Sequence, residues 1–211
     1  MLPQLQPALS EYYSDNAEPL KTRIFDSIWE AFNQPNATCV SKPKVLDLGE
    51  AQPDSFNFYS EQAGYLTIAD CIKPLSELEW PEEENPNQFL TKQIEEIIPL
   101  TNIQYDLILG WDSFNFIQSK ILPYVHNHLL SFCTNKTMIH GFLFTSENRP
   151  TYPSVFKILD SGRIKHAVSN DQVRQHTPLT PLAINKYMPN FKYARSVLMR
   201  SGLQEFVLTH K

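Results

Sequence analysis

The segment with the clearest potential for chemistry is Lys44–Asp54, in which three acidic side chains surround one glycine. The apolar residues of Val45–Leu48 predict a short buried strand, which carries Asp47 and ends at Gly49. A strand that ends this way before a helix opens the ligand pocket of nucleotide-binding α/β domains, because backbone amides approach the ligand there. Asp47 either contacts such a ligand or only hydrogen-bonds the turn, as aspartate often does before a helix.

A second acid, Asp70, closes the next predicted strand, Tyr65–Ala69. It lies 23 positions after Asp47, whereas nucleotide-binding folds place such an acid about 20 positions on. A carboxylate has two acceptor oxygens and can therefore accept hydrogen bonds from both hydroxyls of a ribose. Asp70 is thus either a ribose ligand or an ordinary loop acid.

A third candidate pair, Trp111 and Asp112, follows the predicted strand Tyr105–Gly110. Trp111 either lines a pocket or packs in the core, since tryptophan buries much apolar area. Asp112, Glu147 and Asn148 offer oxygen ligands of the kind Mg²⁺ prefers, but their spacing is a poor match to any metal motif. No metal site is predicted.

The histidines and the remaining motifs give no catalytic assignment. His126 and His128 lie two apart on a predicted helix and point to different sides, so packing or surface roles are expected. His140 lies inside a core strand and is expected to be a hydrogen-bonded interior histidine. The sequence has no Gly-x-Ser-x-Gly elbow, P-loop or zinc-type Cys/His spacing.

The elements that must position these residues alternate between strands and helices, which implies a mostly parallel sheet. Strands are predicted at 45–48, 65–69, 105–110, 137–145, 155–159, 163–168, 191–199 and 203–209, and helices at 20–32, 54–62, 85–98, 121–132 and 182–188. An acidic loop is expected at 75–87, and 101–104 is too short to supply a third strand between Asp70 and Tyr105. We expect a three-layer α/β/α, doubly wound Rossmann-like sheet that ends in an antiparallel β-hairpin. A helical segment, 1–40, would pack on the main domain, 41–211, which has a hairpin insertion near 153–169.

Together, Val45–Gly49, Ile68–Asp70, Tyr105–Leu109 and the closing hairpin resemble class I S-adenosylmethionine-dependent methyltransferases over about residues 40–211. The resemblance implies S-adenosylmethionine as the cofactor. Its methionine part would lie at the first turn, its ribose at Asp70 and its reacting end beyond the predicted strand 105–110. By position, the implied cofactor-binding residues are Asp47, Gly49, Glu50, Ala51, Asp70, Trp111 and Asp112. No catalytic residue is assigned.

The chain departs from that family at several motifs. The first turn reads Gly49-Glu50-Ala51 instead of glycine-x-glycine, and alanine at positive φ would cost about 1 kcal/mol. The Asn/Asp-Pro-Pro-aromatic signature is replaced by Gly110–Ser113, and Asn135–Thr137 stands where a glycine pair often precedes the fifth strand. The chain has only six glycines against sixteen prolines, which is few for a fold that binds phosphate groups through its backbone.

Two functions therefore stay open. One is a methyltransferase that acts on a small molecule or a protein, for which positioning alone can supply much of the rate. The other is a catalytically inactive relative that binds a partner, with the hairpin 155–168 and the N-terminal helix as contact surfaces. A nicotinamide-dependent reductase is weaker, because the chain has no Tyr-x-x-x-Lys pair.

Composition limits the partners and the compartment. The 211 residues carry a net charge of −5 without a basic cluster, so the sequence gives no evidence for nucleic-acid binding. The three cysteines are widely spaced, which favours reduced thiols. No signal peptide or apolar run of ~20 residues is present, so we expect a cytoplasmic protein without a membrane segment. A protein partner or a homodimer is compatible with this composition.

Overall fold

The computed structural model describes residues 18–34, 42–168 and 173–211. Most of the predicted N-terminal helical segment, together with Cys39, lies outside these residues. Among the described residues, no helix is long and apolar enough to cross a membrane.

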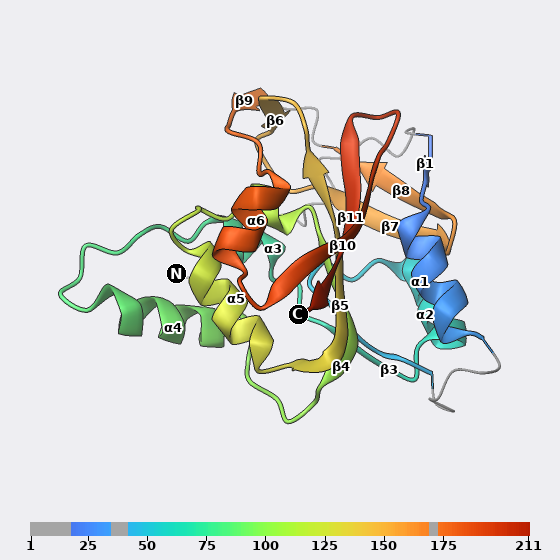
Figure 1. The fold of residues 1–211 in the computed structure, drawn as a ribbon, viewed down its shortest axis with the longest axis horizontal. Coiled ribbons are helices and arrows are strands. Elements are labelled where there is room, and N and C mark those ends of the chain that lie inside the picture. The colour runs from blue at the N-terminus through green and yellow to red at the C-terminus, as the bar shows by residue number, and fades with distance from the viewer. Residues whose placement is uncertain (1–17, 35–41, 169–172) are drawn as a thin grey trace, which may run out of the picture.

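A six-stranded sheet in the order β10-β11-β5-β4-β2-β3 forms the centre of the molecule (Figure 1). Strands β3, β2, β4 and β5 run parallel, whereas β11 is antiparallel to both of its neighbours. This confirms the predicted, mostly parallel sheet with a closing antiparallel hairpin. The strands are β2 (Lys44–Asp47), β3 (Tyr65–Ile68), β4 (Tyr105–Trp111), β5 (Cys133–Phe144), β10 (Phe191–Leu198) and β11 (Leu203–His210).

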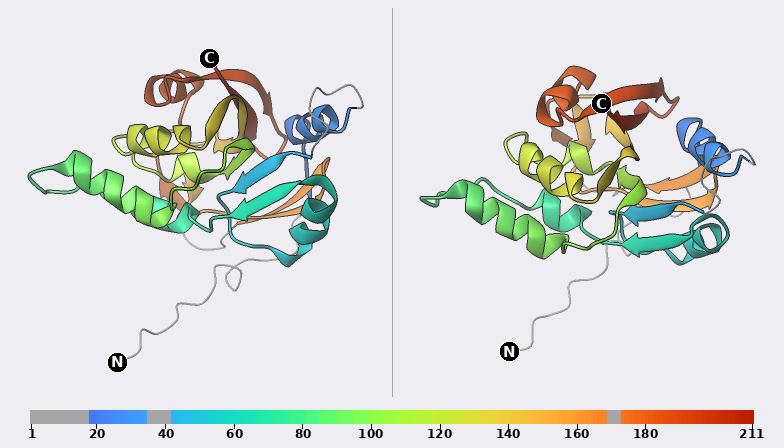
Figure 2. Two further views of the ribbon diagram at one scale, coloured as in Figure 1. Left: turned by 90° about the horizontal axis from the view of Figure 1, so that it is seen from below. Right: turned by 60° about the horizontal axis from the view of Figure 1, so that its bottom comes forward.

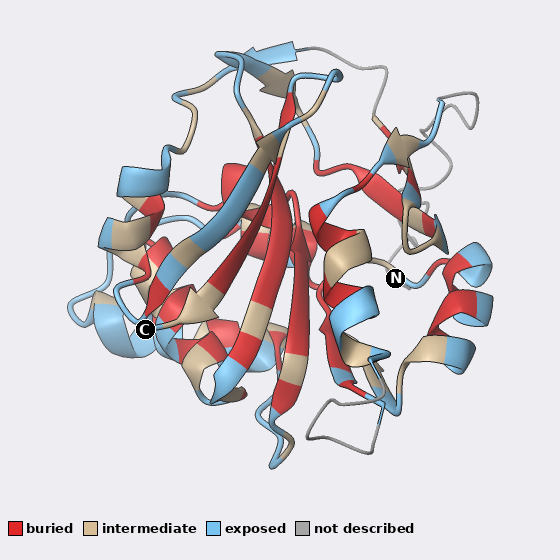
Figure 3. Ribbon diagram, turned by 45° about the vertical axis from the view of Figure 1, so that its right-hand side comes forward, coloured by how far each residue is buried: buried red, intermediate tan, exposed pale blue. Residues whose placement is uncertain are grey.

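Helices cover both faces of this sheet, which gives three layers (Figures 1 and 2). Helices α1 and α2 lie on one side, and α4, α5 and α6 lie on the other. The central strands are buried along most of their length, as strands covered on both faces must be (Figure 3). The helices are α1 (Ile24–Phe32), α2 (Pro53–Gln62), α3 (Ile72–Ser76), α4 (Pro86–Ile97), α5 (Leu122–Leu130) and α6 (Pro181–Tyr187), and a short 3₁₀ turn spans Ser113–Asn115.

A second, three-stranded sheet lies beside α2. It contains the predicted insertion hairpin, now β7 (Val155–Asp160) and β8 (Arg163–Ala167), and a two-residue strand, β1 (Leu20–Lys21), in the order β1-β8-β7. The hairpin is confirmed, but the start of the first predicted helix was wrong. Leu20 pairs with Ile164 in β8 instead of continuing the helix.

Several local predictions differ from the structure. The predicted acidic loop begins inside α3, and Leu75 and Leu78 are buried because they pack into the core. On α2, Tyr59 and Phe58 are buried, whereas Phe56, which helical spacing would place on the face of Tyr59, is 48% exposed. Two short strands, β6 (Asn148–Pro150) and β9 (Val173–Gln175), were not predicted. Residues 69–104, all described, contain no strand, so β3 is an edge of the sheet.

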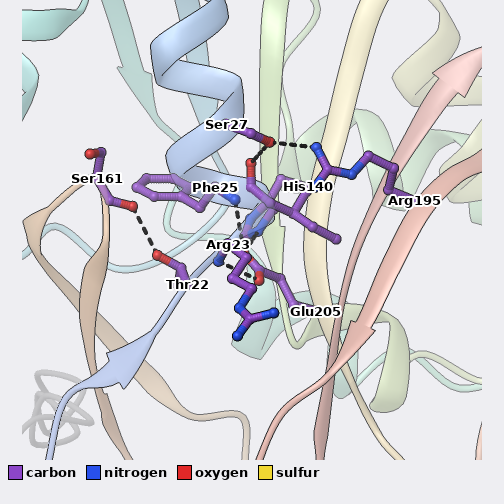
Figure 4. A network of polar contacts seen from close by, with 9 residues as sticks. Thr22, Arg23, Phe25, Ser27, His140, Ser161, Arg195 and Glu205 are labelled. Atoms are coloured by element: carbon purple, nitrogen blue, oxygen red, sulfur yellow. Dashed lines mark hydrogen bonds and ion pairs between the residues drawn. The ribbon is translucent and has the colours of Figure 1, made fainter.

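The N-terminus of α1 is held by a buried carboxylate from the last strand (Figure 4). Glu205 in β11 accepts hydrogen bonds from the backbone N–H groups of Arg23 at 3.0 Å and Phe25 at 2.8 Å, and from His140 Nε2 at 3.1 Å. Burial alone would raise the pKa of Glu205, but the hydrogen bond from His140 and the two backbone donors outweigh it and hold the pKa below its usual value. His140 is therefore the hydrogen-bonded interior histidine that the sequence predicted.

Candidate functional site

The site expected from the sequence lies at the carboxyl ends of β2, β3 and β4, where an α/β sheet binds its ligands. Its central acid, Asp47, is 4% exposed and accepts three hydrogen bonds from within the chain. Gly49 N–H donates at 2.8 Å, Trp111 Nε1–H at 2.5 Å and the Tyr59 hydroxyl at 2.5 Å. Burial raises the pKa of Asp47, although these hydrogen bonds act to lower it. The carboxylate therefore accepts its hydrogen bonds from the first turn, from β4 and from α2.

The indole of Trp111 lies directly over Gly49. A Cβ atom added to Gly49 would come within 2.8 Å of Trp111 Cδ1 and Nε1, so the glycine admits this side chain at close range. Trp111 has a φ of 48°, a left-handed conformation that is strained for a bulky residue. Its ring stacks on Phe156 of β7, with centroids 4.9 Å apart and planes 11° from parallel. Phe156 stacks in turn on Phe142 and His166. The space above the first turn is therefore filled by an aromatic stack.

The loops that follow β2 and β3 are bonded to each other through their backbones. Ala69 N–H donates to Asp47 O at 2.8 Å, Cys71 N–H to Leu48 O at 3.0 Å and Asp70 N–H to Gly49 O at 3.2 Å. Asp70 has a φ of 45°, whereas Ala51 does not adopt a positive φ. The first turn therefore takes a path that avoids strain at Ala51, and the left-handed residue lies in the partner loop.

Asp112 lies behind Trp111 and is completely buried. Its Oδ2 accepts a hydrogen bond from Ser154 N–H at 2.9 Å, and its Oδ1 has no partner. Burial raises the pKa of Asp112 to about 7, and hydrogen bonding to Ser154 offsets this only in part. Below that pH the Asp112 carboxyl keeps its proton, whereas a carboxylate that binds a metal ion must be ionised.

Two hydrogen bonds hold the insertion hairpin against the site. Ser154, just before β7, bonds to Asp112 as described, and Ile158 N–H donates to Ser55 Oγ of α2 at 2.9 Å. Both contacts are buried. The hairpin thus packs against the first turn as part of the core.

The space left at the predicted cofactor site is a cavity of about 20 Å³. Four of the predicted site residues line it: Gly49, Glu50, Asp70 and Trp111. Asp47 and Asp112 lie buried behind this lining, and Ala51 is exposed at the start of α2. A cavity of this size holds about one water molecule, whereas pockets for cofactor-sized ligands measure about 300–1,000 Å³. S-adenosylmethionine does not fit the residues as they are arranged.

Sequence reasoning missed the residues that close the site. Tyr59 lies in the predicted helix 54–62 and Phe156 in the predicted hairpin strand 155–159, with no signal that either would reach Asp47 or Trp111. Asn115 was also missed; its amide bonds to Asp112 O at 2.7 Å and Phe142 O at 2.9 Å, which ties the loop after β4 to β5. An asparagine soon after a strand end is only a weak signal for hydrogen bonds of this kind.

The weaker candidates have structural roles. His128 Nε2 donates to Ile98 O at 2.7 Å, and His126 packs its ring edge-on against Phe191. Within the part of the chain that the structure describes, no three His, Cys, Asp or Glu side chains come together as a metal site. Asp112 in particular binds Ser154 and is not grouped with Glu147.

Comparison with known proteins gives structural resemblances but no sequence relatives. No protein-family profile matches the sequence, and no curated protein matches it. A 1,6-didemethyltoxoflavin-N1-methyltransferase from Burkholderia thailandensis is 12% identical with a TM-score of 0.48 over 90% of this chain and 77% of its own. An S-adenosylmethionine-dependent methyltransferase from Clostridium acetobutylicum is 13% identical with a TM-score of 0.40, over 79% and 83%. The glycopeptide N-methyltransferase MtfA is 13% identical with a TM-score of 0.44, over 87% and 93%.

The strand order and the closing antiparallel strands match the Rossmann-like sheet that the sequence predicted, with β3 as one edge. The TM-scores of the three structures lie below 0.5, so these resemblances assign neither a cofactor nor a substrate to this chain.

Proposed function

We propose that this protein is a methyltransferase-fold binding module whose cofactor site has closed. The observation that carries the proposal is the position of Trp111, which covers Gly49 and donates a hydrogen bond to Asp47. In an active relative, Asp47 and Gly49 would receive the methionine part of S-adenosylmethionine, and Trp111 would lie at its reacting end. In this structure the three residues contact one another instead.

A working methyltransferase is the competing function, and it requires the aromatic stack to leave. Moving Trp111 would break its hydrogen bond to Asp47 and its stacking on Phe156. Leaving a buried carboxylate short of a donor costs about 1–3 kcal/mol, and exposing a tryptophan side chain adds its burial energy. The free energy of cofactor binding would have to offset both costs before any net affinity remained. The geometry therefore favours the binding module.

Calorimetric titration of the purified protein with S-adenosylmethionine and with S-adenosylhomocysteine tests this proposal. We expect no saturable heat up to millimolar ligand, while a cooperative urea transition in the same preparation verifies that the protein is folded. Saturable binding of either ligand that Asp70→Asn weakens would contradict the proposal, because Asp70 lies at the entrance of the predicted ribose site and does not support the core.

A further inference from the structure

A hollow of about 730 Å³ lies between α4, α5 and the loop that joins α3 to α4. Helices α4 and α5 lie side by side, on the face of the sheet opposite α1 and α2 (Figure 2). The volume is within the range of ligand-binding pockets. Among the described residues, this hollow and the small cavity at the closed site have no lining residue in common. We call it the α4–α5 groove.

The apolar surface of the α4–α5 groove is open to solvent. Trp80 of the α3–α4 loop is 37% exposed, Leu100 just after α4 is 55% exposed, and Tyr124 of α5 is half-buried. The rings of Trp80 and Tyr124 meet edge to face, with centroids 6.1 Å apart and planes at 63°. Two accessible aromatic rings set at an angle form the kind of surface on which proline-rich segments dock.

Hydrogen-bond donors line the same groove. The side-chain oxygens of two asparagines are already bonded, because Asn87 Oδ1 accepts from the Tyr124 hydroxyl and Asn127 Oδ1 accepts from His126 Nδ1 at 3.2 Å. Both asparagines are exposed, and among the described residues neither amide nitrogen has an acceptor. The two NH₂ groups are therefore available to a ligand. A polyproline II segment makes no internal hydrogen bonds, so its carbonyl oxygens can accept from them.

The surroundings of the groove are acidic. Glu95 of α4 lines it, and five more glutamates are exposed on the loop that carries Trp80: Glu77, Glu79, Glu82, Glu83 and Glu84. Within the described part of the chain, none of these six has an ion pair, whereas Lys92 pairs with Glu96. Lys120 lies at the Trp80 ring, with its Nζ 5.8 Å from the centroid. The unpaired glutamates favour a partner that carries positive charge.

We propose that the α4–α5 groove binds a proline-rich segment of a partner protein, flanked by arginine or lysine. Proline rings would pack on Trp80 and Tyr124. Backbone carbonyl oxygens would accept from the amides of Asn87 and Asn127, and the flanking cations would lie near the glutamates. Such a segment is extended before it binds, so it loses little conformational entropy. The inference names a partner for the proposed binding module and rests on that proposal, although it concerns different residues.

The test uses a fluorescein-labelled peptide of five prolines between two arginines as the probe, with fluorescence anisotropy at low and at physiological salt. We expect saturable binding that weakens with salt and is about fivefold or more tighter than that of a peptide with glycines in place of the prolines. Trp80→Ala should weaken the proline peptide about tenfold or more. The matched control Phe56→Ala removes a similarly exposed ring from α2 and should bind as the wild type does.

A second variant, Asn87→Ala/Asn127→Ala, leaves the Trp80 loop unchanged and should weaken the proline peptide about threefold or more. A cooperative urea transition verifies that each variant is folded. Three results would overturn the inference: no saturable binding of the proline peptide to the wild type, equal affinity for the glycine peptide, or an equal loss in Trp80→Ala and Phe56→Ala.

Titration of S-adenosylmethionine into the same preparations keeps this inference apart from the proposed function. If neither the proline peptide nor the cofactor binds, the inference fails and the closed site stands. If the cofactor binds and the proline peptide binds normally, the closed site alone is removed.

Discussion

Asp112→Asn should change how the stability of the protein depends on pH. The folded state holds the carboxyl at a pKa of about 7 because the group is buried, whereas in the unfolded chain an aspartate has a pKa near ~3.9. Between these two values the unfolded chain has released the proton and the folded chain still binds it. The unfolded state therefore binds fewer protons, and the free energy of unfolding falls as the pH rises.

The size of this effect follows from the two pKa values. One pKa unit corresponds to about 1.4 kcal/mol, and most of the interval between the two values lies above pH 5. From pH 5 to pH 8, Asp112 should remove about 2–3 kcal/mol from the wild-type free energy of unfolding. Asparagine stays neutral, and its carbonyl oxygen can still accept from Ser154 N–H. The variant should therefore lack this decline.

Urea unfolding, followed by circular dichroism at pH 5, 6, 7 and 8, measures this decline in the free energy of unfolding. The informative quantity is the variant minus the wild type at each pH, because other groups then cancel. His166, whose pKa burial lowers to about 4, contributes with the opposite sign in both proteins. The difference should grow by about 2–3 kcal/mol from pH 5 to pH 8. A difference that stays constant within about 0.5 kcal/mol, near the precision of such extrapolations, would refute a buried, protonated Asp112.

Three further substitutions test the packing that closes the site and anchors the helices. Gly49→Ala should destabilise the ligand-free protein by about 1–3 kcal/mol in urea unfolding, since the new Cβ meets the Trp111 indole at 2.8 Å; a neutral effect would mean that the indole lies elsewhere. Ser55→Ala should cost about 1–3 kcal/mol, because the buried Ile158 N–H loses its acceptor, while the exposed control Ser60→Ala should cost less. Glu205→Gln should destabilise at pH 7 by about 1.5–3 kcal/mol. A depressed pKa stabilises only above the unfolded value near ~4.3, so this last deficit should shrink as the pH falls below it, and a pH-independent deficit would contradict the charge argument.

The sheet could be predicted because its strands are short apolar runs whose pattern is local. Tyr105–Trp111 and Phe191–Leu198 were placed within one or two residues, and the missing third strand was visible as a stretch without such a run. The insertion hairpin was also visible, from Asp160-Ser161-Gly162 between two apolar segments.

The state of the site could not be predicted, because it depends on pairs that are distant in sequence. The sequence allowed Asp47 to be a ligand or a turn acid, and it gave no sign that Asp47 bonds to Tyr59, 12 positions away, and to Trp111, 64 positions away. Nothing in the spacing of Phe156 shows that it stacks on Trp111. Local pattern fixes where a pocket can form, whereas the side chains that fill it are chosen by the three-dimensional packing.

The contact between α1 and Glu205 has a consequence for synthesis of the chain on the ribosome. Phe25 and Glu205 are 180 positions apart, so the carboxylate that accepts from the start of α1 is made long after the helix itself. At about 5–20 residues per second, the interval is roughly 10–40 s. During that time the apolar face of α1, which includes Ile24, Phe25, Ile28 and Trp29, has neither its anchor nor the last strand to pack against. Phe25 and Trp29 can already pack against Phe58 of α2 in this interval, but the first N–H groups of α1 stay without their carboxylate acceptor until β11 emerges.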